Sequence, residues 1–254
     1  TVANSKCPHR GASLTLGRIR GEHLICGYHG LYYDHDGKCI KNPYDDSNTK
    51  TTISKRLCLT TYPVIERYGL IWTCLAGEAR EPLPEWQALE DANVQIAAHM
   101  DFDVKTSAGR YTENFNDLAH TPWIHEATFS TSGEDMECTK RASVDLKETT
   151  NGIYVKVESE DQNKDTFGAA PVNVSSEYFC TFPFTSYLKM DHHDLGNQYY
   201  FLIMSPTSSK TTRAFMVMAR DYDKEKPVDE FVAFQELVNE EERTRIVNHN
   251  VQCL

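Results

Sequence analysis

The sequence predicts an α+β protein, in which an N-terminal all-β domain precedes a domain with an antiparallel sheet flanked by helices. In the first 85 residues, short strand-like segments alternate with glycine-containing turns. A proline-containing segment at 77–86 follows them. Beyond it, alternating apolar stretches stand between two helical patterns. We therefore expect two domains, residues 1–85 and residues 86–254.

Composition excludes several classes of protein. The chain has 254 residues and a formal net charge of -11, with no cluster of Lys and Arg that could bind nucleic acid. It contains no apolar run of the roughly 20 residues that span a bilayer, and no signal peptide is visible at its start. Eight cysteines are scattered along the chain rather than spaced as a disulfide framework. These features predict a cytoplasmic protein without a membrane partner.

The first candidate site is "CPHRGASLTLGRIRGEHLICGYHG", residues 7–30. Cys7-x-His9 and Cys26-x-x-His29 each combine one thiol and one imidazole within a turn of small residues. A structural zinc ion is one candidate for this ligand set. Zinc sites, however, usually pair Cys with Cys and His with His. Mixed pairs suit a two-iron cluster in which one iron takes both cysteines and the other both histidines.

The segments that follow predict strands. The stretches 22–30, 31–40 and 61–75 are rich in β-forming residues, and Asp36-Gly37 predicts a tight turn within the second. In the second domain, strand-like stretches cover residues 141–149, 152–160, 175–190, 198–208 and 212–223. His192 and His193 stand in a turn-rich segment, where we expect both side chains to be exposed.

The second candidate site is "ENFNDLAHTPWIHEATF", residues 113–129, where Asp117, His120 and His125 are spaced D-x-x-H-x4-H. On a helix, residues three apart share a face, so Asp117 and His120 are expected to converge. Pro122 should end or kink that helix and bring His125 towards His120. Two histidines and a carboxylate form the facial ligand set of non-haem Fe(II) enzymes.

These two motifs resemble those of the catalytic subunit of Rieske non-haem iron oxygenases. The spacing of the first matches the Rieske signature C-x-H-x(15–17)-C-x-x-H, and "ENFNDLAHTPWIH" resembles that family's iron-binding segment. The ligand loops lack the additional cysteines of respiratory Rieske proteins. One departure is Leu31, where oxygenases most often have Trp. The resemblance is greatest to the single-component-type N-/O-demethylases and aromatic-ring hydroxylases.

The resemblance implies two cofactors, a [2Fe–2S] cluster and a mononuclear Fe(2+). The cluster would be held by Cys7, His9, Cys26 and His29, and the single iron by His120 and His125. In the family, the Asp at the position of Asp117 links an iron-ligating histidine to a Rieske histidine of the neighbouring subunit. This arrangement implies a head-to-tail ring, and we expect a homotrimer.

The same resemblance implies an oxygenase that takes O2 and electrons from a separate reductase or ferredoxin. It would hydroxylate or oxidatively demethylate a small aromatic or N-/O-methylated compound. Ring dihydroxylation is the alternative enzymatic activity, and a Rieske electron-transfer protein is the non-enzymatic alternative. The family normally has several strands before its first ligand loop, so the N-terminal strands are apparently missing from this sequence.

The third iron ligand is expected on the final helix, where the position matching the family's Asp is Glu242. At 100° per residue, the apolar residues form an inward stripe, which we take to be Phe231, Phe234, Leu237, Val238 and Ile246. Glu242 falls near roughly 20° from Phe231, whereas Glu240 falls near roughly 180°, on the solvent side. The alternative is a solvated run of glutamates without a metal role.

Overall fold

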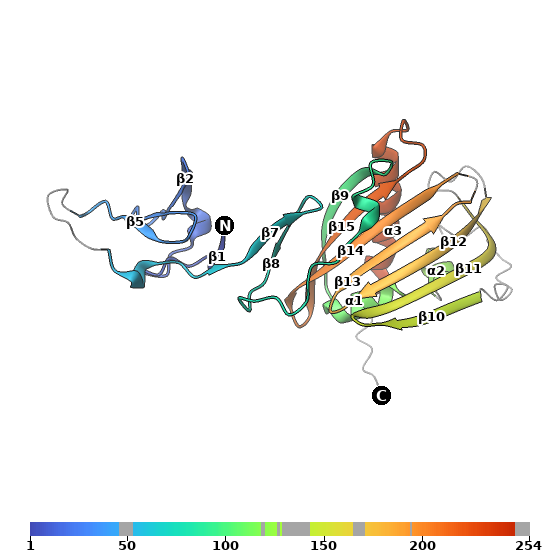
Figure 1. Cartoon of the computed structure of the whole chain (residues 1–254), viewed down its shortest axis with the longest axis horizontal. Helices are drawn as coiled ribbons and strands as arrows, with labels where there is room; N and C mark the ends of the chain where they lie inside the picture. Colours follow the sequence, from blue (N-terminus) through green and yellow to red (C-terminus); the bar gives the residue numbers. More distant parts are fainter. Residues whose placement is uncertain are drawn as a thin grey trace. The chain divides into compact units, whose positions relative to one another are not determined.

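The computed structural model describes residues 1–45, 53–117, 120–125, 128, 143–164, 171–193 and 195–246. The chain divides into two compact units, Thr1–Leu83 and Pro84–Leu254, which we call the N-terminal and C-terminal units (Figure 1). The sequence prediction placed this division between residues 85 and 86. None of the described helices has the length and apolar character needed to cross a membrane.

The N-terminal unit is built from short antiparallel strands. Its main sheet has four strands in the order β2-β3-β4-β5, namely Arg18–Arg20, His23–Ile25, Tyr32–Tyr33 and Cys39–Lys41. Two further pairs are β1 with β6, at Val2–Ala3 and Thr61–Tyr62, and β7 with β8, at Val64–Arg67 and Leu70–Thr73. Short 3-10 helices occupy Leu14–Leu16 and Lys55–Leu57.

The core of the N-terminal unit is small and contains two of the predicted ligands. Its buried members are Cys7, Leu14, Cys26, Leu31, Tyr33, Cys39 and Leu59. Leu31, the departure from the family's usual Trp, is among them and is 2% exposed. Cys7 and Cys26, one from each ligand loop, are thus part of the hydrophobic core of the unit.

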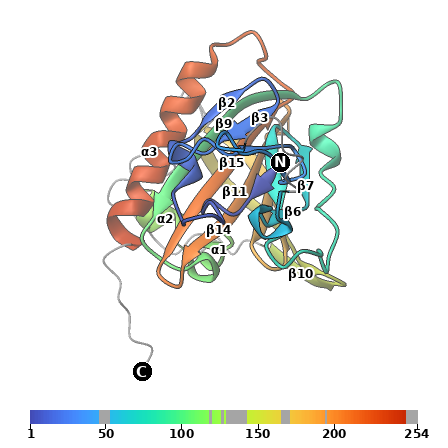
Figure 2. The same cartoon turned by 90° about the vertical axis from the view of Figure 1, so that its left-hand side faces the viewer.

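The described residues of the C-terminal unit form one seven-stranded antiparallel sheet, whose strands are labelled in Figure 1; Figure 2 shows strands β9, β14 and β15 from another side. The strand order is β10-β11-β12-β13-β14-β15-β9. Strands β10 to β15 therefore pair in the order of the sequence, and β9 pairs with β15 at the edge opposite β10. The strands are Gln95–Val104 (β9), Ser143–Thr149 (β10), Gly152–Lys164 (β11), Pro171–Thr181 (β12), Thr185–Asp191 (β13), Asn197–Ser208 (β14) and Thr211–Arg220 (β15). A 3-10 helix, Gln87–Leu89, precedes them.

Both faces of this sheet are covered near its centre, and strand alternation explains how. On β14, Tyr200, Leu202 and Met204 point into a core shared with the helices. The intervening Phe201 points to the other face, where its ring lies 4.8 Å from that of Trp86. Burial on both sides explains why this strand reads as a continuous apolar run rather than a polar–apolar alternation.

The described part of this unit contains three α-helices: α1 (Ala108–Phe115), α2 (Thr121–Ile124) and α3 (Val228–Ile246). Tyr111 of α1 and Phe231 of α3 share one core with the sheet, so both helices cover the same face. This arrangement confirms the predicted fold class, in which an N-terminal β region precedes an antiparallel sheet flanked by helices.

The helical expectation for the second motif was wrong in detail. α1 ends at Phe115, before Asp117, and α2 begins at Thr121, after His120. Asp117 and His120 therefore lie in the connection between two helices and not on one helical face. Pro122 lies at the start of α2 because its fixed φ and missing N–H suit a first helical turn.

The inward stripe of α3 also needs one correction, because Leu237 is 61% exposed. At 100° per residue it falls near roughly 240° from Phe231, too far round the helix to reach the sheet. The buried face instead continues through polar side chains, and its members are Phe231, Gln235, Val238, Asn239 and Glu242. A hydrophobic pattern alone could not identify a face that is half polar.

Candidate metal centres

The two ligand loops of the N-terminal unit share one backbone geometry. In the first loop, the Cys7 carbonyl accepts from the Gly11 N–H at 2.8 Å; in the second, the Cys26 carbonyl accepts from the Gly30 N–H at 3.0 Å. Each glycine has a positive φ, +72° and +67°, which non-glycine residues rarely adopt. The recurrence of Gly four residues after each Cys therefore has a conformational cause.

The cysteine and histidine side chains of these loops differ in burial. The Cys7 and Cys26 side chains are 3% and 2% exposed, whereas His9 is exposed and His29 is half-buried. The two imidazole rings lie side by side with centroids 4.7 Å apart. Two buried thiols behind two outward-facing imidazoles fit a two-iron cluster with a cysteine-bound inner iron and a histidine-bound outer iron.

Tyr33 lies directly behind the first loop and is fully buried. Its hydroxyl is 3.1 Å from the Cys7 Sγ. Burial, followed by the neighbouring Cys7 thiol, raises the pKa of Tyr33 far above its usual value. The phenol therefore stays protonated and can donate a hydrogen bond to a Cys7 thiolate.

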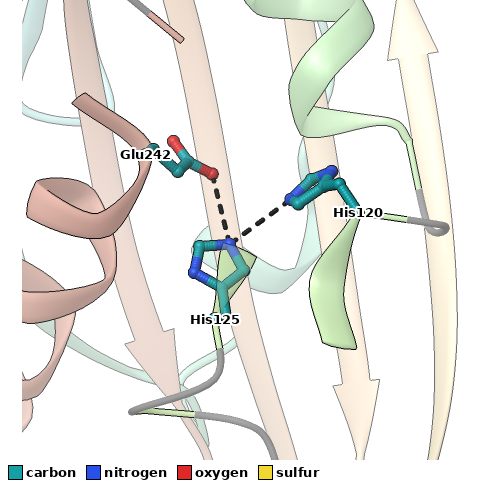
Figure 3. Close-up of side chains that lie close together, drawn as sticks. All are labelled: His120, His125 and Glu242. Carbon is teal, nitrogen blue, oxygen red and sulfur yellow. Dashed lines mark hydrogen bonds and ion pairs between the residues drawn. The ribbon is translucent and has the colours of Figure 1, made fainter. Parts of the chain in front are cut away.

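In the C-terminal unit, His120, His125 and Glu242 converge (Figure 3). One potential ligand atom from each residue lies within 4.8 Å of the others. The His120 and His125 Nε2 atoms are 3.3 Å apart, and the Glu242 Oε1 is 3.6 Å from the His125 Nε2. Three groups that could each bind a cation are thus held together in a buried place, which is the arrangement expected of a metal centre.

Glu242 is held by a hydrogen bond from a neighbouring residue, whereas the Asp117 carboxylate lies beyond hydrogen-bond distance of the His120 Nδ1. Tyr111 donates a 2.7 Å hydrogen bond to the Glu242 Oε2. Asp117 places an oxygen 3.9 Å from the His120 Nδ1. Because Tyr111 binds one carboxylate oxygen of Glu242, the other oxygen is the one directed towards the histidines.

His125 is contacted by two carboxylates. Its Nδ1 is 3.0 Å from the Glu241 Oε2, on the side of the ring away from the Nε2 that faces Glu242. The same Glu241 oxygen accepts a 2.7 Å hydrogen bond from the Thr128 hydroxyl. Adjacent glutamates of α3 therefore face the two nitrogens of a single imidazole.

The electrostatic environment differs between the two histidines. Burial is the largest influence on both and disfavours the imidazolium. It lowers the pKa of His120 below the usual value. For His125, the carboxylates of Glu242 and Glu241 outweigh burial and raise the pKa. This pair of acids thus makes the site attractive to a cation of any kind.

Sequence reasoning missed the residues that support the ligands. Tyr111, Glu241 and Thr128 contact the site, yet none has a spacing that marks it in the sequence. Tyr111 precedes the recognised motif by two residues and stands on α1, so a reading of the motif as the end of a longer helix could have drawn attention to it. The expectation for His192 was also wrong, because its side chain is 2% exposed; His193 is exposed as predicted.

Comparisons with known proteins match each of the two regions that contain a candidate site to a protein family. Residues 1–63 match the family model for the Rieske [2Fe-2S] domain. Residues 104–249 match the model for the vanillate O-demethylase oxygenase C-terminal domain. The first match contains the four predicted ligands of the loop site, and the second contains His120, His125 and Glu242.

Among curated relatives, methylxanthine N1-demethylase NdmA of Pseudomonas putida is 28% identical over 240 residues, which cover 94% of this chain and 66% of that protein. The oxygenase component of dicamba O-demethylase from Stenotrophomonas maltophilia is 31% identical over 135 residues, 51% of this chain and 38% of its own length. This chain therefore spans about two thirds of the length of methylxanthine N1-demethylase NdmA.

The solved structure of Pseudomonas putida NdmA with caffeine superposes with a TM-score of 0.83 at 25% identity, covering 98% of this chain and 70% of that one. Dicamba monooxygenase bound to dicamba superposes with a TM-score of 0.80 at 21% identity, over 94% of this chain and 73% of the other. The similarity to the second structure establishes a shared fold.

Family membership rests on three agreements: the two matched domains in their order, the shared fold, and a Cys/His loop pair followed by converging His, His and Glu side chains. The matched domains also identify the cofactors as a [2Fe–2S] cluster and a mononuclear non-haem iron. The chain belongs to the Rieske non-haem iron oxygenases, with a Rieske domain followed by an oxygenase domain of the vanillate O-demethylase type.

Proposed function

We propose that the chain is the oxygenase component of a system that removes a methyl group from, or hydroxylates, a small aromatic or N-/O-methylated compound. The observation that carries the proposal is the convergence of His120, His125 and Glu242 in a domain of vanillate O-demethylase type. When bound, the cluster and the single iron supply stored electrons and activation of O2.

The ligand assignments are part of the proposal. Cys7 and Cys26 would bind the inner iron of the cluster, and His9 and His29 the outer one. The buried thiols and outward imidazoles support this division. His120, His125 and Glu242 would bind the mononuclear iron through Nε2, Nε2 and Oε1. Tyr111 would hold the second Glu242 oxygen and so keep coordination positions open for O2 and substrate.

For a demethylation, a C–H bond of the methyl group is hydroxylated. The resulting hemiaminal or hemiacetal then loses formaldehyde and leaves the amine or hydroxyl product. The residues around the single iron serve this reaction by fixing the ligand atoms before substrate arrives. Such preorganisation matters because displacements of about 1 Å can cost two orders of magnitude in rate.

Asp117 is proposed to link the two kinds of centre across a subunit boundary. Its side chain is 51% exposed and an oxygen lies 3.9 Å from the His120 Nδ1. A carboxylate that faces an iron-ligating histidine and also reaches the surface can hydrogen-bond to the partner subunit's His29. A head-to-tail homotrimer provides that neighbour for every chain.

Electrons would come from a separate reductase or ferredoxin, and we place the protein in the cytoplasm. Cys7, Cys26, Cys39, Cys58, Cys74 and Cys180 are free cysteines in the described residues, which suits a reducing compartment.

Substrate-dependent O2 consumption tests the proposal. The protein, reconstituted with iron and sulfide, would be supplied with a surrogate reductase and a panel of methylated aromatics and N-methyl heterocycles. Formaldehyde released in proportion to O2 consumed supports demethylation. A ring diol without formaldehyde would indicate dihydroxylation instead. A protein that holds two irons per chain, accepts electrons and consumes no O2 with any substrate would contradict the proposal.

A further inference from the structure

Two consecutive glutamates of α3 contact opposite nitrogens of His125. The Glu242 Oε1 is 3.6 Å from Nε2, and the Glu241 Oε2 is 3.0 Å from Nδ1. Consecutive side chains on a helix diverge by about 100°, so neighbouring glutamates rarely serve the same partner. They do so here because the imidazole lies between them and presents one nitrogen to each.

Glu241 is itself fixed in place. Its side chain is 17% exposed, and the oxygen that contacts His125 also accepts the 2.7 Å hydrogen bond from Thr128. Thr128 is 5% exposed. A carboxylate oxygen that accepts from two buried donors has little freedom to turn away, so the contact with His125 is geometrically constrained.

Other acids near the site are placed differently. Glu240 is 62% exposed and pairs with Arg243 at 3.7 Å. Asp117, on the other histidine, is 51% exposed and lies 3.9 Å from its Nδ1. Glu241 therefore combines hydrogen-bonding distance with burial, which are the two properties that make a carboxylate effective in orienting an imidazole.

We propose that Glu241 is a positioning residue for the mononuclear iron. By accepting the Nδ1–H of His125, it fixes the tautomer in which the Nε2 lone pair is free, and it directs that lone pair towards Glu242 and His120. A negative carboxylate on Nδ1 also increases the electron density of the ring and thus its affinity for a metal ion. This inference rests on the proposed function, because it requires that His125 binds iron.

The experiment compares metal affinity in three variants of the full chain with its Rieske cluster intact. Fe(II), and separately Co(II) as a spectroscopic probe, would be titrated into protein freed of the mononuclear iron. Glu241→Leu should lower the affinity about 10- to 100-fold, as loss of such an outer carboxylate typically does. Glu241→Gln should lower it less, because the amide oxygen still accepts the Nδ1–H. Glu240→Leu is the matched control and should bind as the wild type does.

A spectroscopic readout separates positioning from general damage. If Glu241 orients the ring, the visible bands of bound Co(II) should shift in Glu241→Leu and return towards the wild-type position in Glu241→Gln. The Rieske absorption should stay the same in every variant. Should Glu241→Leu fail to fold, Thr128→Val and Glu241→Gln carry the test, with smaller losses of affinity expected in both.

Three results would overturn the inference. Wild-type affinity and Co(II) bands in Glu241→Leu would remove the positioning role, provided that Glu242→Ala still loses the metal. Complete loss of metal in Glu241→Gln, equal to that in Glu242→Ala, would make Glu241 a ligand itself. Normal mononuclear metal binding in Glu242→Ala would instead show that the proposed metal centre, and not Glu241 alone, had been assigned wrongly.

Discussion

The two metal sites of this chain are built in opposite ways. The N-terminal site takes its proposed ligands from two short loops, Cys7–His9 and Cys26–His29, each closed by its own backbone hydrogen bonds. The C-terminal site exists only when α3 packs beside α2, since Glu242 lies on α3 and the two histidines lie at the ends of α2, far away in the sequence. A site whose residues are close together in the sequence can be found from a motif, whereas a site whose residues are far apart in the sequence depends on the fold.

The same difference appears in what surrounds the ligands. Around the loops, glycines with positive φ determine the geometry, and outer imidazoles face solvent. At the three converging side chains, Tyr111 holds Glu242, and Glu241, itself bound by Thr128, holds His125. Single substitutions should therefore have all-or-none effects at the first site and graded effects among the supporting residues of the second.

The largest effect is expected from Cys26→Ala. Removing a buried thiolate ligand from the N-terminal site should abolish the [2Fe–2S] cluster, its broad visible absorption and all turnover. Iron and sulfide analysis with the visible spectrum provides the measurement. If the variant kept two irons and sulfide, the assignment of the loop site would be wrong.

A comparable loss, confined to the other site, is expected from Glu242→Ala. Without this carboxylate the two histidines are left as a two-ligand site, so the mononuclear iron should be lost while the Rieske spectrum remains. Iron content should fall from three per chain to two. The control is Glu240→Ala, which should change neither, because that side chain is 62% exposed. Three irons per chain and normal turnover in Glu242→Ala would exclude it as a ligand.

These contrasts explain which parts could be predicted from sequence. The Cys/His loop pair was visible from its spacing, whereas the family and the proposed role of the two histidines came from the resemblance of both motifs to a known family. The inward direction of Glu242 followed from helical angles alone, although its role as a ligand stays a prediction. Leu237 was misplaced because the buried face of α3 is completed by Gln235 and Asn239, and apolar patterning gives no weight to buried amides.

The remaining differences have similar physical causes. The stretch 175–190 reads as uniformly strand-like, yet the chain turns at 182–184 between β12 and β13. The turn falls there because Pro183 has no N–H to donate to the ladder. Glu241 could not be identified as a partner of His125 without knowing how α3 docks, since the two residues lie 116 positions apart.

An intermediate effect is expected from Asp117→Asn, which tests whether the two sites communicate between subunits. The variant should retain both metals because Asp117 is not among the converging ligands, and its carboxylate is 3.9 Å from His120. It should lose most of its turnover, since the charge that we propose links His120 to the partner subunit's His29 is gone. The direct readout is the rate at which the reduced cluster is reoxidised in a single turnover.

Slow reoxidation with an unchanged cluster spectrum is the result that supports this link. A reoxidation rate close to that of the wild type would remove Asp117 from the electron path. Sedimentation of the same sample tests the ring, for which a mass of three chains is expected. A stable monomer with full activity would contradict the exchange of electrons between subunits.

The smallest effect is expected from Tyr111→Phe, because it removes one support of the C-terminal site and none of its ligands. The lost hydroxyl leaves a buried carboxylate oxygen of Glu242 without its 2.7 Å donor. A hydrogen bond to a charged group contributes about 1.5–3 kcal/mol. The Tm of the protein without its mononuclear iron should therefore fall by roughly 3–12 °C. Tyr44→Phe, at a side chain that is 78% exposed, should leave the Tm unchanged.

Adding Fe(II) should widen this Tm difference, and that is what distinguishes a support of a metal ligand from a simple packing contact. If Tyr111 holds Glu242 in place for the iron, Tyr111→Phe binds Fe(II) more weakly, so the metal stabilises the variant less than the wild type and the Tm gap should grow when Fe(II) is added. A gap that stayed constant with and without Fe(II) would mean that Tyr111 stabilises the contact between α1 and α3 independently of the metal centre. Differential scanning calorimetry of both proteins, with the Rieske cluster present throughout, separates the two outcomes.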